Sequence, residues 1–252
     1  MFPIGDSIPR RNPPITTWLL IILNSLVFVF EIGMSPERLH RLFYLFGLVP
    51  ARITHPSWPL WVGFPINAYW PLLTCMFVHG NWLHIIGNMW ALWIFGDNVE
   101  DRMGPVRFLF FYLLCGLAAG MVHVFTNPDS TLPTVGASGA IAGVMGAYFV
   151  LFPYARVIVF IPLLFIPLFF EMPAVLFLGM WALTQFFSGT LALAAGSYVR
   201  GIAWWAHVGG FFSGVLLQFL FVPRKGAYRR PFRDEYQTAG AWVPARYWRS
   251  SS

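Results

Sequence analysis

Long apolar stretches separated by polar connections make up most of the chain. Each runs for roughly 15 to 20 residues without the alternation of apolar and polar positions that marks the strands of a membrane barrel, so each predicts a membrane-spanning helix. The predicted spans cover residues 15–33, 72–95, 106–125, 136–152, 173–187 and 202–222. The pattern therefore predicts an all-α membrane protein built as a bundle of six transmembrane helices.

Two further segments are rich in apolar residues but do not fit a span. Residues 34–71 form a long connection, interrupted by prolines, whose aromatic residues are typical of a segment at the membrane interface. Residues 157–170 form an apolar run broken by Pro162 and Pro167, too short for a crossing. We expect the first segment to be partly embedded in the membrane and the second to be re-entrant or interfacial.

The composition agrees with a membrane protein and excludes a soluble enzyme. Charged residues make up 10% of the chain and hydrophobic residues 58%, whereas about a quarter of the residues of a soluble domain are charged. Cys75 and Cys115 lie in or beside apolar segments without the spacing of metal ligands, so we interpret them as small buried side chains. We expect neither a cofactor nor a metal.

The chain divides into three regions. Residues 1–14 form a polar, proline-rich arm, residues 15–222 the membrane domain, and residues 223–252 a basic, disordered tail. No cleavable signal peptide is apparent, so the first span is expected to act as a signal anchor. Six crossings place both termini on one side, and most arginines and lysines fall on that side too, as the positive-inside rule requires for cytoplasmic termini.

The localisation and the partners follow from this charge distribution. We expect a multi-pass protein of the bacterial plasma membrane, with the arm and the tail in the cytoplasm. The net charge of +6 comes mainly from the tail. It indicates topology and contact with the anionic headgroups of the lipid bilayer, not nucleic-acid binding.

Four polar residues, distant in sequence, are predicted to lie at one depth in the outer half of the membrane. Ser138 begins the fourth span, His207 lies near the start of the sixth, and His84 and Asn88 stack on one face of the second. Each alone has an ordinary explanation as helix back-bonding or interhelical hydrogen bonding. Polar groups at membrane depth are costly, however, so their convergence favours a functional site.

Small residues suggest how the serine and the histidine meet. Gly139 and Gly143 on the fourth span and Gly210 and Gly214 on the sixth form two GxxxG patterns, which let helices approach closely. If the glycine faces meet, a histidine at position 207 can take the hydroxyl proton of Ser138 and activate it as a nucleophile.

Donors for a developing oxyanion are available in the same layer. They are the amide of Ser138 at a helix N-terminus and the side chains of Asn88 and His84. No acidic residue is expected beside the histidine, so the pattern predicts a Ser-His dyad rather than a triad.

These residues occur in motifs that resemble those of the rhomboid intramembrane serine proteases. The motifs are Gly136-Ala-Ser138-Gly139, Ala206-His207-Val-Gly-Gly210-Phe-Phe-Ser-Gly214 and His79-Gly-Asn-Trp-Leu-His84-Ile-Ile-Gly-Asn88. The resemblance implies that Ser138 is the nucleophile and His207 the base, with His84 and Asn88 at the oxyanion. It also implies that His79 supports the long first loop, and that Glu100 and Arg102 form a structural pair at the inner end of the second helix.

Two positions depart from the family's pattern. Pro71 follows Trp70 where many members have an arginine, so any role of that arginine in the first loop is missing here. Ala142 stands where some members place a tyrosine against the catalytic histidine. The group that packs on His207 is therefore unassigned, with Trp204, Trp205 and Tyr148 as candidates.

The resemblance implies a serine endopeptidase that cleaves single-pass transmembrane proteins near the outer leaflet. The alternative is an inactive rhomboid-like protein that binds membrane clients for trafficking or degradation, although both the serine and the histidine are present. A transporter is a weaker alternative, because the polar groups gather in the outer half rather than at the midplane. A zinc protease is weaker still, because no HExxH motif occurs. The sequence specifies neither the physiological substrate nor the oligomeric state.

Overall fold

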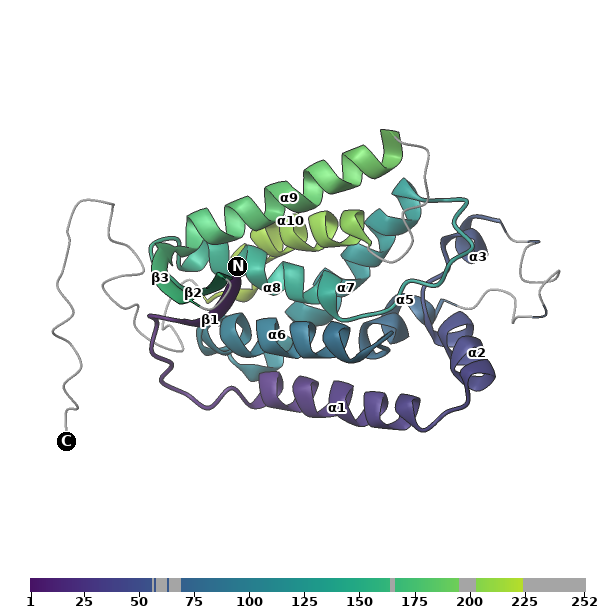
Figure 1. The fold of residues 1–252 in the computed structure, drawn as a ribbon, viewed down its shortest axis with the longest axis horizontal. Coiled ribbons are helices and arrows are strands. Elements are labelled where there is room, and N and C mark those ends of the chain that lie inside the picture. Colours follow the sequence, from purple (N-terminus) through teal and green to yellow (C-terminus); the bar gives the residue numbers. More distant parts are fainter. Residues whose placement is uncertain (56, 58–62, 64–68, 164–165, 195–202, 224–252) are drawn as a thin grey trace, which may run out of the picture.

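The computed structural model describes residues 1–55, 57, 63, 69–163, 166–194 and 203–223 (Figure 1). The predicted tail from residue 224 onward, Arg200, Trp58 and Trp61 lie outside the described residues. The long helices are α1 (Ile15–Ile32), α6 (Trp82–Met103), α7 (Pro105–Thr126), α8 (Ser138–Leu151), α9 (Ala174–Ala194) and α10 (Trp204–Phe221). The fold is thus the predicted helical membrane bundle.

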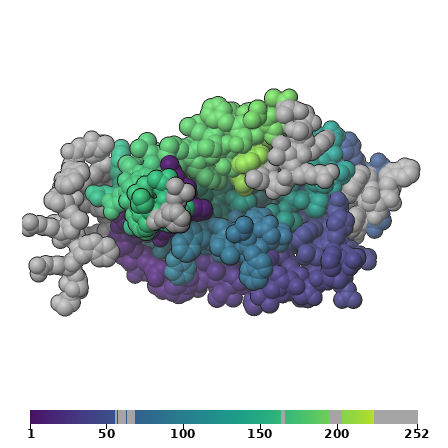
Figure 2. Space-filling model, in the orientation of Figure 1, coloured from purple at the N-terminus to yellow at the C-terminus, as the bar shows by residue number. Residues whose placement is uncertain are grey.

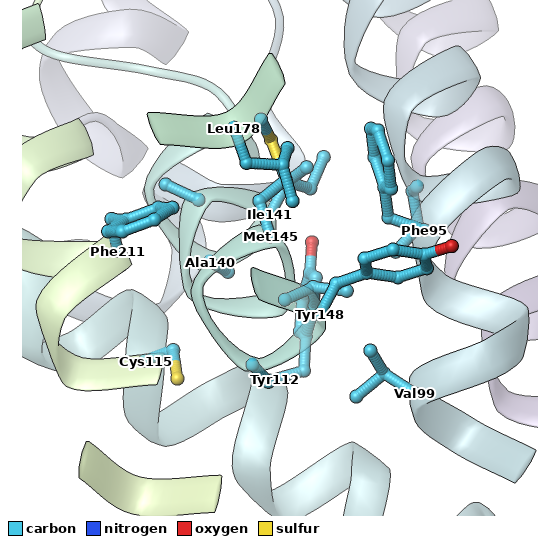
Figure 3. Close-up of a cluster of buried hydrophobic side chains, with 14 of the residues drawn as sticks. Phe95, Val99, Tyr112, Cys115, Ala140, Ile141, Met145, Tyr148, Leu178 and Phe211 are labelled. Carbon is cyan, nitrogen blue, oxygen red and sulfur yellow. The ribbon is translucent and has the colours of Figure 1, made fainter. Parts of the chain in front are cut away.

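Helix α8 lies at the centre of this bundle. Ten of its fourteen residues are buried, and it contacts α6, α7, α9 and α10. Figure 3 shows its side chains among residues of all four neighbours: Phe95 and Val99 of α6, Tyr112 and Cys115 of α7, Leu178 of α9, and Phe211 of α10. Helix α1 packs outside α6 and α7 (Figure 1). We call the end of the bundle where α6, α8 and α10 begin the site end, and the opposite end the sheet end.

The long helices differ in how closely they match a membrane span. Within the described residues, α1, α7, α9 and α10 are long and apolar enough to cross a bilayer. Helix α6 carries a polar last turn. Helix α8, with 14 residues, is about 21 Å long, shorter than the roughly 30 Å of a hydrocarbon core. Because α8 is enclosed by other helices, it does not have to match the lipid thickness.

The sheet end holds a small antiparallel sheet, which corrects the prediction for residues 157–170. The segment does not re-enter the bundle: β2 (Arg156–Leu163) and β3 (Ile166–Pro173) form a hairpin at its end, and β1 (Phe2–Asp6) pairs with the other edge of β2. Val157 and Val159 alternate inward into the core. Pro162 lies opposite Pro167 near the connected end of the hairpin, beyond the last pair of β1 with β2 at Phe160, where prolines are tolerated.

Three predicted boundaries are also corrected. Helix α6 begins at Trp82 rather than at residue 72, because Asn81 caps it by accepting a hydrogen bond from the His84 amide at 2.9 Å. The apolar residues before it form the short turns α5 (Pro71–Thr74) and η1 (Cys75–Phe77). Helix α6 ends at Met103 rather than at residue 95, and α9 continues to Ala194 rather than ending at residue 187.

The long first connection contains α2 (Pro36–Phe46) and α3 (Pro50–Thr54). Arg52 of α3 is buried, and its guanidinium donates to the carbonyl oxygens of Tyr44 and Leu45 at 3.3 and 3.4 Å. It also lies 5.4 Å from the ring of Trp70, whose indole N–H donates to the Leu45 carbonyl. An arginine side chain thus does stabilise this connection from within, but it is Arg52 and not the residue that follows Trp70.

Glu100 ties α6 to the start of α1. Its carboxylate accepts hydrogen bonds from the amides of Thr16 and Thr17 at 2.8 and 2.7 Å, and from the Thr17 hydroxyl at 2.8 Å. These amides belong to the first turn of α1, where no intrahelical acceptor exists. Arg102, the expected partner of Glu100, is also buried and lies two residues further along α6. Glu100 therefore acts as a cap for α1, a role that the expected pair with Arg102 did not suggest.

Candidate active site

The structure brings Ser138 and His207 together. The hydroxyl oxygen of Ser138 lies 2.8 Å from Nε2 of His207, although the residues are 69 positions apart. Ser138 is the first residue of α8, and His207 lies in the first turn of α10. Neither side chain is fully buried. A hydroxyl and an imidazole at this distance can exchange a proton, which is the geometry required of a nucleophile and its base.

The two helices can approach this closely because glycines face each other along the seam. A Cβ atom at Gly210 would overlap the carbonyl oxygen of Gly139, and one at Gly214 would overlap that of Gly143. Gly139 and Gly143 also face α7, where a Cβ at Gly139 would lie 2.7 Å from the Cβ of Ala119. The predicted meeting of the glycine faces is confirmed, and it places the first turns of α8 and α10 side by side.

Gly136 shapes the turn before the serine. Its φ of 120° is open to glycine and strained for other residues. Its amide donates to the carbonyl oxygen of Cys75 at 2.8 Å. A Cβ here would lie 2.5 Å from Nε2 of His84 and 3.4 Å from Nδ2 of Asn88. The predicted oxyanion residues therefore lie against the backbone two residues before Ser138.

His79 holds Asn88 in place. It precedes α6 rather than lying on it, and it is 1% exposed. Its Nε2 lies 3.0 Å from Nδ2 of Asn88, and its backbone amide donates to the carboxylate of Glu31 on α1 at 3.2 Å. The ring of His84 contacts that of His79 with centroids 5.2 Å apart. His79 thus orients Asn88 through one N–H of its amide, and the second N–H has no further partner among the described residues.

Two residues of α9 also contact His207, and both were missed from the sequence. Oε1 of Gln185 lies 2.7 Å from Nδ1 of the histidine. The indole of Trp181 lies over the imidazole, with ring centroids 5.9 Å apart and an angle of 35° between the planes. Trp181 and Gln185 are four residues apart, so they share one face of α9.

Comparison with known proteins identifies the family. The family model described as Rhomboid domain matches residues 67–224, more than half of the chain. The chain belongs to the rhomboid family. Together with its apolar helices, this makes the rhomboid chain an integral membrane protein.

Curated relatives agree with this membership. Rhomboid protein 1, mitochondrial, of Saccharomyces cerevisiae is 29% identical over 172 residues, which cover 66% of this chain and 45% of the relative. Rhomboid protease GluP of Bacillus subtilis is 31% identical over 139 residues, covering 55% of this chain and 25% of the relative. RHOMBOID-like protein 5 of Arabidopsis thaliana is 36% identical over 78 residues, 31% of this chain and 25% of the relative. The rhomboid chain spans less than half of the length of each of these three relatives, and the family includes a named protease.

The aromatic contact on His207 comes from α9 and not from α8, because Ala142 stands where some family members have a tyrosine. With no ring on α8 at this place, Trp181 of α9 supplies one. The three candidates from the sequence were wrong: Tyr148 packs against Phe95 and Phe152, Trp205 packs against Phe186, and Trp204 faces Gly189 of α9.

Gln185 could have been noticed earlier as the one amide in an otherwise apolar run of this rhomboid. The prediction of a dyad rested on the lack of an acidic partner for His207, whereas a neutral amide oxygen also accepts a hydrogen bond from an imidazole N–H.

Proposed function

We propose that this rhomboid is an intramembrane serine endopeptidase in which Ser138 is the nucleophile and His207 the general base. The observation that carries the proposal is the 2.8 Å hydrogen bond between Ser138 Oγ and His207 Nε2. It occurs between half-buried side chains at the end of a helix seam, and a substrate peptide would have to reach the hydroxyl there.

The reaction would proceed in two halves. In the first, Ser138 Oγ attacks the substrate carbonyl carbon while Nε2 of His207 takes the hydroxyl proton. The imidazolium then gives this proton to the leaving amine, and an acyl-enzyme forms. In the second half, a water attacks the acyl carbon, His207 takes its proton and returns it to Ser138, and the new carboxyl end is released.

Charge on the substrate oxygen would be stabilised by donors around the turn at Gly136. The Ser138 amide opens α8 and has no intrahelical acceptor. Asn88 offers the N–H that does not face His79, and His84 adds its ring. Donors of this kind are each worth about 2.7 to 4 kcal/mol of transition-state stabilisation in other serine proteases.

The substrates would be single-pass transmembrane proteins, reached through the surrounding lipid bilayer. A helical substrate must unwind to present a carbonyl to Ser138, so small or helix-breaking residues near the end of its span should favour cleavage. The site end lies opposite the sheet end, where α1 begins (Figure 1). We propose cleavage in the leaflet opposite the N-terminus, with the termini in the cytoplasm if the membrane is a bacterial plasma membrane.

The test is cleavage of a reporter with one transmembrane helix in liposomes. Wild-type protein should cleave the reporter, and Ser138→Ala should reduce the rate to background. Ser213→Ala is the matched control, because the hydroxyl of Ser213 donates to the carbonyl oxygen of Gly209 within α10. Undiminished cleavage by Ser138→Ala would reject the assignment. An inactive client-binding rhomboid would retain the reporter without cutting it.

A further inference from the structure

The hydrogen bonds around Gln185 have a defined direction. The hydroxyl of Thr184 lies 2.6 Å from the carbonyl oxygen of Trp181, and because a carbonyl can only accept, the Thr184 proton is committed there. The Thr184 oxygen then accepts from Nε2 of Gln185, which is 3.3 Å away. The opposite amide orientation would place two oxygens together without a proton between them.

This orientation points Oε1 of Gln185 at the histidine. Since Oε1 accepts, Nδ1 of His207 must carry the proton at their separation of 2.7 Å. Nε2 is then unprotonated and accepts from the Ser138 hydroxyl. Four hydrogen bonds therefore follow one another, each group donating to the next. They run from Ser138 to His207, Gln185, Thr184 and finally the Trp181 carbonyl oxygen.

We propose that Gln185 is a positioning residue that selects the catalytic tautomer of His207 and makes activity depend on α9 lying against α10. This inference rests on the proposed function and extends it to a third helix. When Nε2 takes the serine proton, the amide oxygen holds the resulting imidazolium in plane, as a neutral acceptor in place of a carboxylate. Trp181, on the same face, limits tilting of the ring.

The packing of α9 makes the dependence on its position specific. Its first turns are buried through Ala174, Phe177 and Leu178, but beyond these the buried side chain is Gln185, followed by Gly189. Leu183 and Phe187 face outward, 56% and 63% exposed, whereas Trp181 and Phe186 contact rings of α10. Among the described residues of α9, Gln185 is thus the buried polar side chain, and its partner on α10 is His207.

The experiment compares Gln185→Met with Gln185→Glu. Methionine has a similar shape but accepts hydrogen bonds poorly, so kcat should fall about tenfold or more, with KM changed by less than about threefold. Glutamate offers an oxygen acceptor whether or not it is protonated, and should recover most of the rate. Gln218→Met is the matched control, a buried glutamine of α10 whose Nε2 lacks a hydrogen-bond partner within the described residues.

A spectroscopic readout separates positioning from mere packing. In protein labelled with ¹⁵N-histidine, the wild-type His207 ring should show a protonated Nδ1 and an unprotonated Nε2 at neutral pH. Gln185→Met should give a mixture of tautomers, and Gln185→Glu a single one. A wild-type ring protonated on Nε2 would overturn the inference, whatever the variants do. So would Gln185→Met with unchanged kcat and spectrum.

The two proposals fail in different ways. If Ser138→Ala cleaves the reporter normally, the proposed function fails, while the tautomer measurement still stands on its own. If wild-type protein cleaves through Ser138 but Gln185→Met and Gln218→Met behave alike, the positioning role of Gln185 fails and the protease remains.

Discussion

Helices α10 and α9 both contact the central helix, but in different ways. Helix α10 meets α8 backbone to backbone, with Gly210 against the Gly139 carbonyl and Gly214 against that of Gly143. Helix α9 meets its neighbours through side chains, and its own Gly179 would tolerate a Cβ 3.6 Å from Phe149. In Figure 2, α9 (green) forms one edge of the molecule, and only a small part of α10 reaches this face.

The difference assigns separate tasks to the two helices. The glycine seam fixes the distance between Ser138 and His207, because neither backbone can move without opening a well-packed contact. Helix α9 supplies the contacts that orient the imidazole, and these contacts are made by side chains. The distance between the catalytic atoms is therefore built into the core, while their orientation depends on a more weakly packed helix.

Substitution in the seam should have the largest effect. In Gly210→Val, the new side chain overlaps the Gly139 carbonyl, so α10 must move away and carry His207 with it. We expect a loss of activity of about 100-fold or more, with destabilisation of about 1–3 kcal/mol. Reporter cleavage and thermal unfolding in detergent measure the two effects.

The matched substitution on the other helix is Gly179→Val, where the space is open to ordinary contact. It should retain most of the activity. Equal losses from the two variants would remove the distinction between the seam and α9.

Substitution of the aromatic contact should have an intermediate effect. Trp181→Leu removes the ring that lies over His207 and should lower kcat by about threefold to tenfold, since such ring contacts contribute about 0.5–1.5 kcal/mol. Steady-state cleavage kinetics give the value. Trp93→Leu, at a side chain of α6 that is 50% exposed, is the control. A Trp181→Leu variant as active as this control would show that the ring does not help orient His207.

The smallest effect is expected at the sheet end, and on stability rather than activity. Burial raises the pKa of Asp6 from 3.8 to about 6. Between these values the folded protein binds more protons at Asp6 than the unfolded chain does, so the free energy of unfolding falls as the pH rises from 4 to 6 and stays lower above 6. Asp6→Asn should remove this dependence and stabilise the protein at pH 7.5 by on the order of 1 kcal/mol.

The measurement is a series of thermal melts of both proteins across this pH range, with cleavage measured in parallel. Asp6 lies on β1, which pairs with β2 of the hairpin. Helix α9 begins directly after the hairpin, and the amide of its first residue, Ala174, donates a hydrogen bond to the carbonyl oxygen of Ala155. Because the His207 contacts, Trp181 and Gln185, lie about two to three turns further along α9 than Ala174, the cleavage rate should not change. A melting difference between the proteins that is constant with pH would contradict the assignment to Asp6.

The helical bundle and the meeting of Ser138 with His207 were predictable because both depend on simple periodic features. Apolar length identifies spans, and glycines at four-residue spacing identify the faces that approach. His84 and Asn88 followed from the same helical geometry. These features are properties of single helices, so they are visible in the sequence.

The hairpin and the α9 contacts were not predictable in the same way. Strands β2 and β3 carry apolar residues on both faces, so the alternation that marks a strand is hidden, and the prolines suggested a break. Gln185 stands out in the sequence as an amide, but that it and Trp181 face His207 depends on the rotation of α9 about its axis. That rotation is set by packing against α8 and α10, which a single sequence does not specify.

The most direct test of the central claim is labelling of the detergent-solubilised protein with a fluorophosphonate probe, followed by peptide mapping. The account predicts modification of Ser138 in the wild-type protein, loss of that modification in His207→Ala, and no modification of Ser213. Labelling of Ser138 at an equal rate in His207→Ala, or cleavage activity that persists without any reactive Ser138, would contradict it.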